Sequence, residues 1–535
     1  MKQRCIIIPA VKKNAVIPDQ LVKKLAGVTL IERAIHTARA VAAGADVLVV
    51  TDSQEITLIC ERGGVRAHYN KDLHFSSLDI VSELRSVLAQ ASREYEHLVV
   101  YRAGCPLVTW VDMEDAYRRF AASGADCLMT VKSVRQRVWQ GREEGIDSLL
   151  GDADDGALVE SKALVMLRSE AFAAGRIGRT VPYFLNDRAL EINSYQDWWI
   201  CEKLLARRKI LFVVAGYPAI GMGHVYRALM LAHEIADHGI EFLCTRESEL
   251  AARSIAERDY KTLSQSGELA DEVLALRPDL VINDMLDTDA GYIRNLKNAG
   301  IRVVNFEDEG SGAAEADLVV NALYSRAGRD ARLLYGPRYF CLRDEFASAC
   351  PNVFRPLART LLISFGGTDH SDFTRKTLDV AAPICEERGM EIRVVAGPGY
   401  AHREALEDRL ARLSGPPIRF THATNVMSRM MEGADLAICS AGRTVYELAH
   451  MRVPALVMAH HERELTHRFA RAANGFAWLG LMRPVFHAGK LRRAFLRLLE
   501  PAARKKLFER QMRFHFAKNK ARLVQRILAL LGSEG

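Results

Sequence analysis

Short apolar runs alternate with amphipathic segments along most of the chain. In the first part, CIIIPA, ADVLVVTDS and HLVVYRAGCPLV are typical of buried strands, and apolar residues in the segments between them recur at the helical period. Repeated strand–helix units of this length predict a mostly parallel sheet with helices on both faces. Such sheets bind ligands at the carboxyl ends of their strands, which here are residues 9–27, 51–53 and 102–106.

The same alternation starts again near residue 207 and once more near residue 346. The helix QDWWICEKLLARRK leads almost directly into the strand that contains Ile210, with no Pro/Gly/Ser linker between them. We therefore predict an α/β protein with domains at residues 1–206, 207–345 and 346–535. The last two are expected to form a pair of Rossmann-like domains that face a shared cleft, the GT-B architecture.

Residues 209–235 hold the first candidate site. An apolar strand leads into a loop in which Gly221 and Gly223 allow the backbone to approach a ligand closely. His224 follows where the helix begins, beside unpaired N–H groups that favour an anion. Its imidazole is suited to general acid–base chemistry. The alternative is a histidine that only caps the helix after an ordinary turn.

Two later loops repeat this arrangement of strand, glycine and helix. In LLISFGGTD, paired glycines free backbone N–H groups for a phosphate, and Thr368 adds a hydroxyl donor. In ADLAICSAGRTVYELAH, residues 440–444 form the loop, and Glu447 in the first helical turn is placed to bind ribose hydroxyls. Plain turns, and the preference of acidic residues for helix N-termini, are the alternatives.

Composition narrows the class of protein. The chain is 49% hydrophobic and 26% charged, with a net charge of +7, which is mild for 535 residues. A basic run begins at Arg504, but its apolar spacing favours a solvated helix face over a nucleic-acid site. The ten cysteines are scattered without a CxxC pair, which favours reduced thiols over disulfides or a zinc site. With no signal peptide or membrane span in the sequence, we expect a cytoplasmic protein.

The first domain carries a family resemblance. IIIPAVKKNAVIPDQLVKKLAGVTLIERAI, VVTDSQEI, VVYRAGCPLV and EINSYQDWWICEKLL resemble, in order, the signatures of the acylneuraminate cytidylyltransferases, which load sialic-acid-like sugars onto CMP. The resemblance covers about 200 residues and implies a Rossmann-like, GT-A-like nucleotidyltransferase fold. It also implies a nucleotide site at these positions, with Mg²⁺ only if the domain is active: Lys12, Lys13, Asn14, Lys23, Asp52, Glu191 and Asn193.

The chemistry of that family is carried over poorly. Its Pro-Ala-Arg-Gly-Gly-Ser-Lys loop reads PAVKKNA here, and its Gln-Pro-Thr-Ser-Pro-Leu segment reads RAGCPL from Arg102. Its Asp-x-Asp motif, expected to hold Mg²⁺, reads Glu191-Ile192-Asn193, so that one carboxylate is missing. We expect this domain to be kept for its fold, with its cytidylyltransferase site inactive.

The rest of the chain carries a second resemblance. GMGHVYRALMLA, LLISFGGTD and ADLAICSAGRTVYELAHMRVPAL resemble the UDP-sugar hydrolase of pseudaminic acid biosynthesis, a relative of the peptidoglycan N-acetylglucosaminyltransferase. The resemblance implies that His224 is the general base, that water attacks the anomeric carbon and that UDP leaves without a metal. It implies nucleotide and phosphate binding by Gly221, Gly223, Arg227, Gly366, Gly367, Thr368, Ser440, Gly442, Arg443, Thr444 and Glu447.

Departures from the second family leave the sugar and the acceptor open. The acidic residue usual after the first strand is absent, and a late Asn-Gln pair is replaced by HHERE at residues 460–464. Metal binding by this segment is the less favoured alternative, because adjacent histidines point in different directions. Candidates for contact with the sugar or acceptor are Asp284, His461, Glu462 and Glu464.

Three functions follow as hypotheses. The favoured one is a nucleotide-sugar enzyme of nonulosonic-acid or surface-glycan biosynthesis, either a UDP-sugar hydrolase or a glycosyltransferase with the same donor site. The second is a bifunctional enzyme whose first domain is also an active CMP-nonulosonate cytidylyltransferase. The third is a nucleotide-sugar-binding scaffold or sensor without turnover. In each case the expected partner is a UDP- or CMP-linked sugar and not nucleic acid, while the base preference and oligomeric state stay open.

Overall fold

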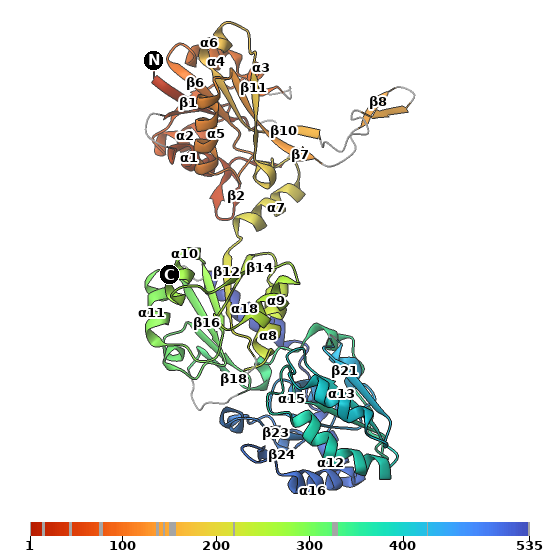
Figure 1. Ribbon diagram of the computed structural model, residues 1–535. Coiled ribbons are helices and arrows are strands. Elements are labelled where there is room, and N and C mark those ends of the chain that lie inside the picture. Colours follow the sequence, from red (N-terminus) through yellow and green to blue (C-terminus); the bar gives the residue numbers. More distant parts are fainter. Residues whose placement is uncertain are drawn as a thin grey trace. The chain divides into compact units, whose positions relative to one another are not determined.

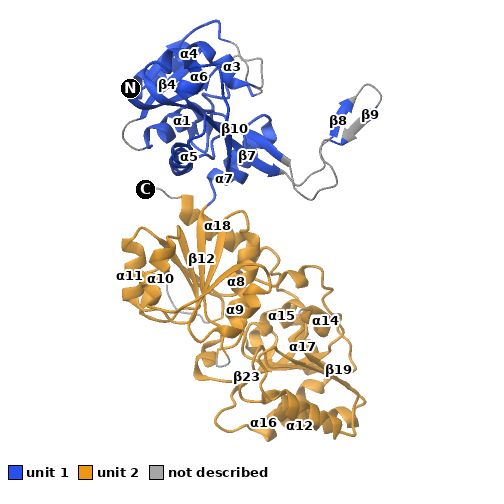
Figure 2. Cartoon of the chain, turned by 45° about the horizontal axis from the view of Figure 1, so that its top comes forward, with its two compact units in different colours: residues 1–207 blue, residues 208–535 orange. Residues whose placement is uncertain are grey.

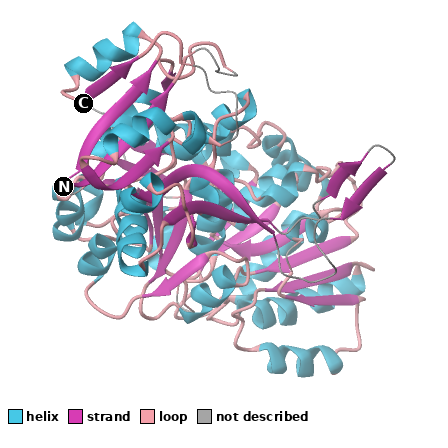
Figure 3. Ribbon diagram, turned by 90° about the horizontal axis from the view of Figure 1, so that it is seen from above, coloured by secondary structure: helices cyan, strands magenta, loops and turns pink. Residues whose placement is uncertain are grey.

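A computed structural model of the chain describes residues 2–12, 17–41, 45–73, 79–134, 139–142, 145–148, 157–217, 220–323, 330–424 and 426–532 (Figure 1). Its contacts divide the chain into two compact units, residues 1–207 (unit 1) and residues 208–535 (unit 2) (Figure 2). Lys13 and Asn14, which the sequence places in a nucleotide site, lie outside the described residues. Each unit is a layered α/β structure, with helices shown in cyan and strands in magenta in Figure 3.

Unit 1 is built on one seven-stranded mixed sheet, in the order β11-β7-β10-β6-β1-β4-β5. All its neighbouring strands run parallel except β10, which is antiparallel to both β6 and β7. The strands are β1 Lys2–Ala10, β4 Ala45–Thr51, β5 Arg66–Tyr69, β6 Tyr95–Tyr101, β7 Cys127–Val134, β10 Ala157–Arg168 and β11 Thr180–Phe184. Two small two-stranded sheets join β2 Lys24–Leu25 to β3 Val28–Thr29 and β8 Trp139–Arg142 to β9 Gly145–Ser148.

Helices cover both faces of the unit 1 sheet because its interior strand β1 is apolar on both faces. In β1, Ile6 and Ile8 belong to one apolar cluster, while Cys5 and Ile7 belong to another. The first cluster includes residues of α1, α5 and α7, and the second includes residues of α3 and α4. The helices are α1 Leu30–Arg39, α2 Gln54–Arg62, α3 Ile80–Glu83, α4 Arg85–Ala91, α5 Trp110–Ser123, α6 Ser169–Ala173 and α7 Tyr195–Leu205.

Unit 2 contains two parallel sheets. The first has the order β14-β13-β12-β15-β16-β17-β18 and the second has the order β21-β20-β19-β22-β23-β24. The first comprises β12 Lys209–Val214, β13 Gly239–Cys244, β14 Lys261–Ser264, β15 Leu280–Asp284, β16 Arg302–Phe306, β17 Leu318–Asn321 and β18 Leu333–Tyr335. The second comprises β19 Thr360–Ser364, β20 Glu391–Ala396, β21 Ile418–His422, β22 Leu436–Ser440, β23 Ala455–Ala459 and β24 Phe476–Leu481.

Both sheets follow the Rossmann order. Numbered by their appearance in the chain, the first six strands of each sheet lie in the order 3-2-1-4-5-6. Two such sheets in one compact unit give the predicted GT-B pair, with binding expected where the strand order reverses, beside β12 and β19. The helices of this unit are α8 Gly223–Glu234, α9 Glu249–Ala256, α10 Leu269–Leu276, α11 Ala290–Asn298, α12 Phe373–Glu387, α13 Arg403–Ala411, α14 Met427–Met431, α15 Thr444–His450, α16 Ala488–Leu499 and α17 Pro501–Gln511.

The last helix, α18 Asn519–Gly532, returns to the first sheet of unit 2. Its Leu523 and Ile527 are buried in the same apolar cluster as residues of β12 and α8. This corrects the predicted division, which assigned all of residues 346–535 to the second sheet. An amphipathic pattern shows that one face of a helix is buried, but not which sheet it covers.

Most cations of the basic run near the C-terminus are exposed, as predicted: Lys505, Lys506, Arg513, Lys518, Arg522 and Arg526. Two of its cations differ. Arg504 is 1% exposed, and its guanidinium donates to the main-chain oxygens of Leu499 at 2.8 Å and Pro356 at 2.6 Å. Lys520 forms ion pairs with Glu234 and Asp344. These two cations therefore connect segments of unit 2, while most of the run faces solvent.

Candidate functional site

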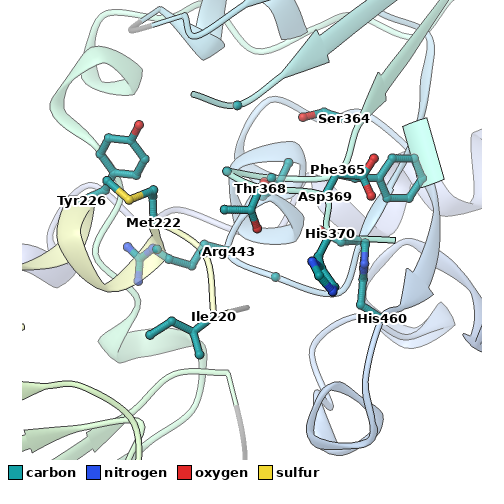
Figure 4. Close-up of a pocket in the computed structure, with 18 of the residues that line it drawn as sticks. Ile220, Met222, Tyr226, Ser364, Phe365, Thr368, Asp369, His370, Arg443 and His460 are labelled. Carbon is teal, nitrogen blue, oxygen red and sulfur yellow. The ribbon is translucent and has the colours of Figure 1, made fainter. Parts of the chain in front are cut away.

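A cleft of about 650 Å³ lies in unit 2, lined by loops that follow the carboxyl ends of strands in both sheets (Figure 4). It brings together glycine loops that are far apart in the sequence, after β12, β19 and β22. Figure 4 shows Met222 and Tyr226 on one side of this space and His370 and His460 on another. The predicted residues that line it are Gly221, Gly223, His224, Gly366, Gly367, Thr368, Ser440, Gly442, Arg443, Thr444, Glu447, His461 and Glu464.

His224 is hydrogen-bonded to a buried carboxylate. Parallel pairing places Asp284, the last residue of β15, beside Val214 at the end of β12, close to the loop that leads into α8. Nδ1 of His224 lies 2.5 Å from Oδ1 of Asp284, a separation that requires a proton between the two atoms. Because an ionised carboxylate only accepts, Nδ1 carries that proton and Nε2 is left as the basic nitrogen.

Arg227 fixes this carboxylate in turn. Its guanidinium donates twice to Asp284, at 2.7 and 2.6 Å, and also to Glu307. Cζ of Arg227 lies 4.9 Å from the centre of the Phe306 ring. Burial alone would raise the pKa of Asp284, but Arg227 and His224 outweigh it and lower that pKa. The pKa of Glu307 is also lowered, because Arg227 and His224 outweigh the effect of burial. His224 is therefore hydrogen-bonded to a carboxylate that stays ionised.

The roles predicted for three residues are corrected by where they lie. Arg227 is 3% exposed and Asp284 is fully buried, and neither lines the cleft. Arg227 is engaged by two carboxylates, so its guanidinium is not placed to bind phosphate, and Asp284 contacts His224 in place of the sugar. Glu462 is exposed to solvent and does not line the cleft either.

The loop after β19, predicted to bind phosphate, is in contact with a glycine outside it. Gly366 has a φ of +83°, which favours glycine, and Gly399 N–H donates to the Gly367 carbonyl at 2.9 Å. A Cβ on Gly397, in the loop after β20, would lie 2.4 Å from Cα of Gly367. The two loops are therefore in direct backbone contact, which the glycines of AGPGY hinted at without indicating their partner.

Two arginines line the cleft near the loop after β22, and only one of them is paired with carboxylates that the structure describes. Arg443 donates to the Cys341 carbonyl at 2.9 Å and stacks on Phe340 at 4.7 Å, and among the described residues no carboxylate is bonded to it. Arg343, which sequence reasoning missed, donates to Glu447 at 2.8 Å. The ribose-binding carboxylate predicted at Glu447 is thus oriented by a residue 104 positions earlier, and no local pattern signals this pairing.

Titratable side chains lie at the other end of the cleft. Glu464 accepts a hydrogen bond from the main-chain N–H of His460 at 2.6 Å, and burial raises the pKa of Glu464 to about 7. Burial lowers the pKa of His460 to about 3, and its ring packs 4.4 Å from that of Phe373. In the described part of the chain, no group of three or more His, Cys, Asp or Glu side chains is arranged to hold a metal.

Arg463, which belongs to the HHERE segment that was expected to face the cleft, links loops of the two sheets of unit 2. It follows β23 in the second sheet and donates to Asp287 of the first at 2.8 Å and to the main-chain oxygen of Glu307. Because Glu307 also binds Arg227, this contact connects the network around His224 to the opposite side of the cleft.

Comparisons with known proteins divide the chain in a similar way. No protein-family model matches it. It is 28% identical over 273 residues to an uncharacterized protein of Methanocaldococcus jannaschii, a match that covers 48% of this chain and only 56% of that protein. It is 26% identical over 269 residues to the spore coat polysaccharide biosynthesis protein SpsG of Bacillus subtilis, covering 48% and 78%. It is 35% identical over 83 residues to a 3-deoxy-manno-octulosonate cytidylyltransferase of Koribacter versatilis, covering 16% and 32%.

Two solved structures show limited similarity to this chain. Acinetobacter baumannii MurG is 16% identical and covers 60% of this chain and 99% of its own, with a TM-score of 0.45. A CMP:2-keto-3-deoxy-manno-octonic acid synthetase in complex with CTP is 14% identical, covering 38% and 98%, with a TM-score of 0.31. Because both scores are below 0.5, we assign the fold from the strand orders above.

The chain joins a cytidylyltransferase-like domain to a GT-B-like pair of domains. No helix in the described ranges has the length and apolar content needed to cross a bilayer.

In the cytidylyltransferase-like domain, those predicted nucleotide residues that the structure describes contact one another or their neighbours. The main-chain N–H of Lys12 donates to Asp52 at 2.8 Å, while Nζ of Lys12 lies 2.8 Å from both Asp19 and Glu55. The remaining ones are likewise in contact with protein groups: Lys23 lies over the rings of Tyr195 and Trp198, Glu191 pairs with Arg102, and Asn193 contacts Glu191. The cationic charge of Lys12 and Arg102 is therefore balanced within the domain.

Proposed function

We propose that the GT-B-like part of this chain cleaves a nucleoside-diphosphate sugar at its anomeric carbon, with His224 as the general base. The observation that carries this proposal is the chain of contacts from His224 through Asp284 to Arg227 beneath a cleft lined by glycine loops. A histidine whose Nδ1–H is held by an ionised carboxylate presents Nε2 as a proton acceptor, which is what general-base catalysis requires.

The reaction can be written with this chain's own residues. A water molecule or an acceptor hydroxyl attacks the anomeric carbon, and its proton passes to Nε2 of His224. The bond between that carbon and the diphosphate oxygen breaks, and the nucleoside diphosphate leaves with the bonding electrons. Asp284 stabilises the imidazolium formed at His224, so we assign it as a positioning residue.

The departing diphosphate has cationic and N–H groups to receive it. The loops at Gly366–Thr368 and at Ser440–Gly442 both line the cleft and are suited to bind phosphate through their backbone N–H groups. The Arg443 guanidinium, to which no described carboxylate is bonded, is available to offset the charge that develops on the leaving group. The proposed cleavage therefore needs no metal ion.

The substrate class rests on resemblance. SpsG is named for spore coat polysaccharide biosynthesis, and two relatives are named 3-deoxy-manno-octulosonate cytidylyltransferases, which favours a place in the synthesis of surface glycans or of nonulosonic acids. We propose a UDP-linked sugar as the substrate of the cleft, a choice that the sequence motifs of unit 2 support.

The test is release of nucleotide by the purified full-length chain from a panel of UDP- and CMP-sugars, with and without candidate acceptors. We expect UDP release in buffer alone, reduced roughly 10²–10⁴-fold in His224→Ala. His233→Ala, on the same helix but exposed, is the matched control and should retain the wild-type rate. Release that depends on an acceptor would identify a glycosyltransferase, and tight binding without turnover would refute catalysis and favour a sensor.

A further inference from the structure

The cytidylyltransferase-like domain brings together two segments at which its sequence departs from the family it resembles, the loop that holds Arg102 and Gly104 and the segment Glu191–Asn193. The main-chain N–H of Ile192 donates to the Gly104 carbonyl at 2.9 Å, and the Gln20 side chain donates to the Ile192 carbonyl at 3.0 Å. A Cβ on Gly104 would lie 3.7 Å from Cγ of Glu191. The loop after β6 and the Glu191–Asn193 segment therefore form one local structure at the edge of the sheet.

The carboxylate of this local structure is engaged by nitrogen donors on both oxygens. Nη2 of Arg102 lies 2.9 Å from Oε1 of Glu191, and the Arg102 and Glu191 side chains are 27% and 15% exposed. The Asn193 amide lies 3.5 Å from Oε2 of Glu191 and 3.3 Å from its main-chain oxygen. Glu191 thus faces a guanidinium on one side and an amide N–H group on the other.

This donor set does not fit the Mg²⁺ ion that the family resemblance implies. Mg²⁺ requires close oxygen ligands, usually with carboxylates among them, in near-octahedral geometry. Here a single carboxylate is paired with Arg102, and the fixed positive charge of the guanidinium opposes a dication at the same place.

We propose that the Arg102–Glu191 ion pair takes the place of the divalent-cation site in this domain, so that unit 1 carries out no Mg²⁺-dependent nucleotidyl transfer. The guanidinium supplies the positive charge that balances Glu191, and the pair fastens the loop after β6 to the segment that leads into α7. This inference concerns residues of unit 1 alone and is independent of the chemistry proposed for His224.

The test restores the missing ligands in the full-length chain and uses Mn²⁺ as the probe. Bound Mn²⁺ is counted by electron paramagnetic resonance for the wild type, for Arg102→Gln with Asn193→Asp, and for the same double variant with Glu191→Gln added. We expect one additional Mn²⁺ per chain in the double variant compared with the wild type, and loss of that ion when Glu191 is also replaced. Arg118→Gln, which removes an exposed pair with Asp115, is the matched control and should gain no Mn²⁺.

Three results would overturn the proposal. The first is a wild-type chain that binds Mn²⁺ and loses it in Glu191→Gln. The second is release of pyrophosphate by the wild-type chain from CTP with a nonulosonic acid and Mg²⁺. The third is a double variant that melts at the wild-type temperature yet gains no ion, since Arg102 would then not be what excludes the ion. If the double variant melts early, Arg102→Gln alone is assayed against the same criteria. UDP release measured on the same samples reports separately on the cleft of unit 2.

Discussion

The two units bring charged side chains to the carboxyl ends of α/β sheets, but they use the charge differently. In unit 2, Asp284 and Glu307 are bound from below by Arg227, which leaves His224 and Arg443 directed to a cleft. In unit 1, Lys12 and Arg102 pair directly with carboxylates of their own domain. A strand-end location alone is therefore a weak guide to chemistry. The more informative property is whether the polar groups there are left available by their neighbours.

The largest effect is expected in the stability of unit 2, where a buried and an exposed ion pair can be compared. Replacing Arg227 with Met leaves two buried carboxylates without a counter-charge and should destabilise unit 2 by about 3–5 kcal/mol. Arg294→Met removes only an exposed pair with Glu315 and should cost about 0–1 kcal/mol. Urea unfolding followed by circular dichroism compares the two variants. Equal losses would mean that the buried network is not what holds the cleft together.

The next largest effect is on turnover. Asp284→Asn keeps the volume of the side chain but presents an amide to His224, so the tautomer that leaves Nε2 basic is no longer favoured. We expect kcat for UDP release to fall roughly 10²-fold or more while UDP affinity changes little. Steady-state kinetics and isothermal titration calorimetry measure the two quantities. Loss of affinity with an unchanged kcat would contradict the role given to Asp284.

A smaller effect is expected from the contact between the two glycine loops. In Gly397→Ala, the new Cβ would collide with the backbone of Gly367 and displace the phosphate-binding loop. We expect the dissociation constant for UDP to rise about tenfold, which is about 1.4 kcal/mol. Gly415→Ala, exposed and with nothing closer than 3.5 Å to the added atom, is the control. Calorimetric titration that gives equal affinities for both variants would refute the loop contact as a requirement.

The smallest effect concerns pH. The pKa of Glu464 in the fold is raised to about 7 from an ordinary 4.5, so the folded chain favours its protonated form. The stability that this preference provides is present below pH 4.5 and is lost as the pH rises through 7. Glu464→Gln mimics the protonated form, and its melting temperature relative to the wild type should rise between pH 5 and pH 8. A constant difference across that range would show that Glu464 is not buried as described.

The repeated strand–helix pattern was enough to predict the sheets that carry the site. The strand at Ile210, the glycine loop and the helix with His224 follow from local periodicity, and they are confirmed as β12 and α8. The antiparallel strand β10 and the small sheet of β8 and β9 were not predicted, because the apolar pattern of a strand does not show which strand it pairs with or in which direction. The return of α18 to the first sheet was missed because its period is compatible with either sheet.

The candidate site could be predicted in its loops but not in its pairings. Glycine loops that follow apolar strands are local patterns, so the glycine loops that line the cleft were found from the sequence. The contacts of Arg227 with Asp284 and Glu307, and of Arg343 with Glu447, join residues 57 to 104 positions apart. Sequence periodicity carries no information about such pairs, so Arg227 was assigned to phosphate and Arg343 was overlooked.

The central claim is cleavage at the anomeric carbon in the cleft of unit 2. The most direct test is to let the full-length chain turn over a UDP-sugar from the active panel in ¹⁸O-labelled water and to locate the label by mass spectrometry. The account predicts that ¹⁸O appears on the released sugar and not on UDP, because water attacks carbon. Label on the phosphate of the released nucleotide would show that phosphorus is attacked, and it would contradict the mechanism assigned to His224.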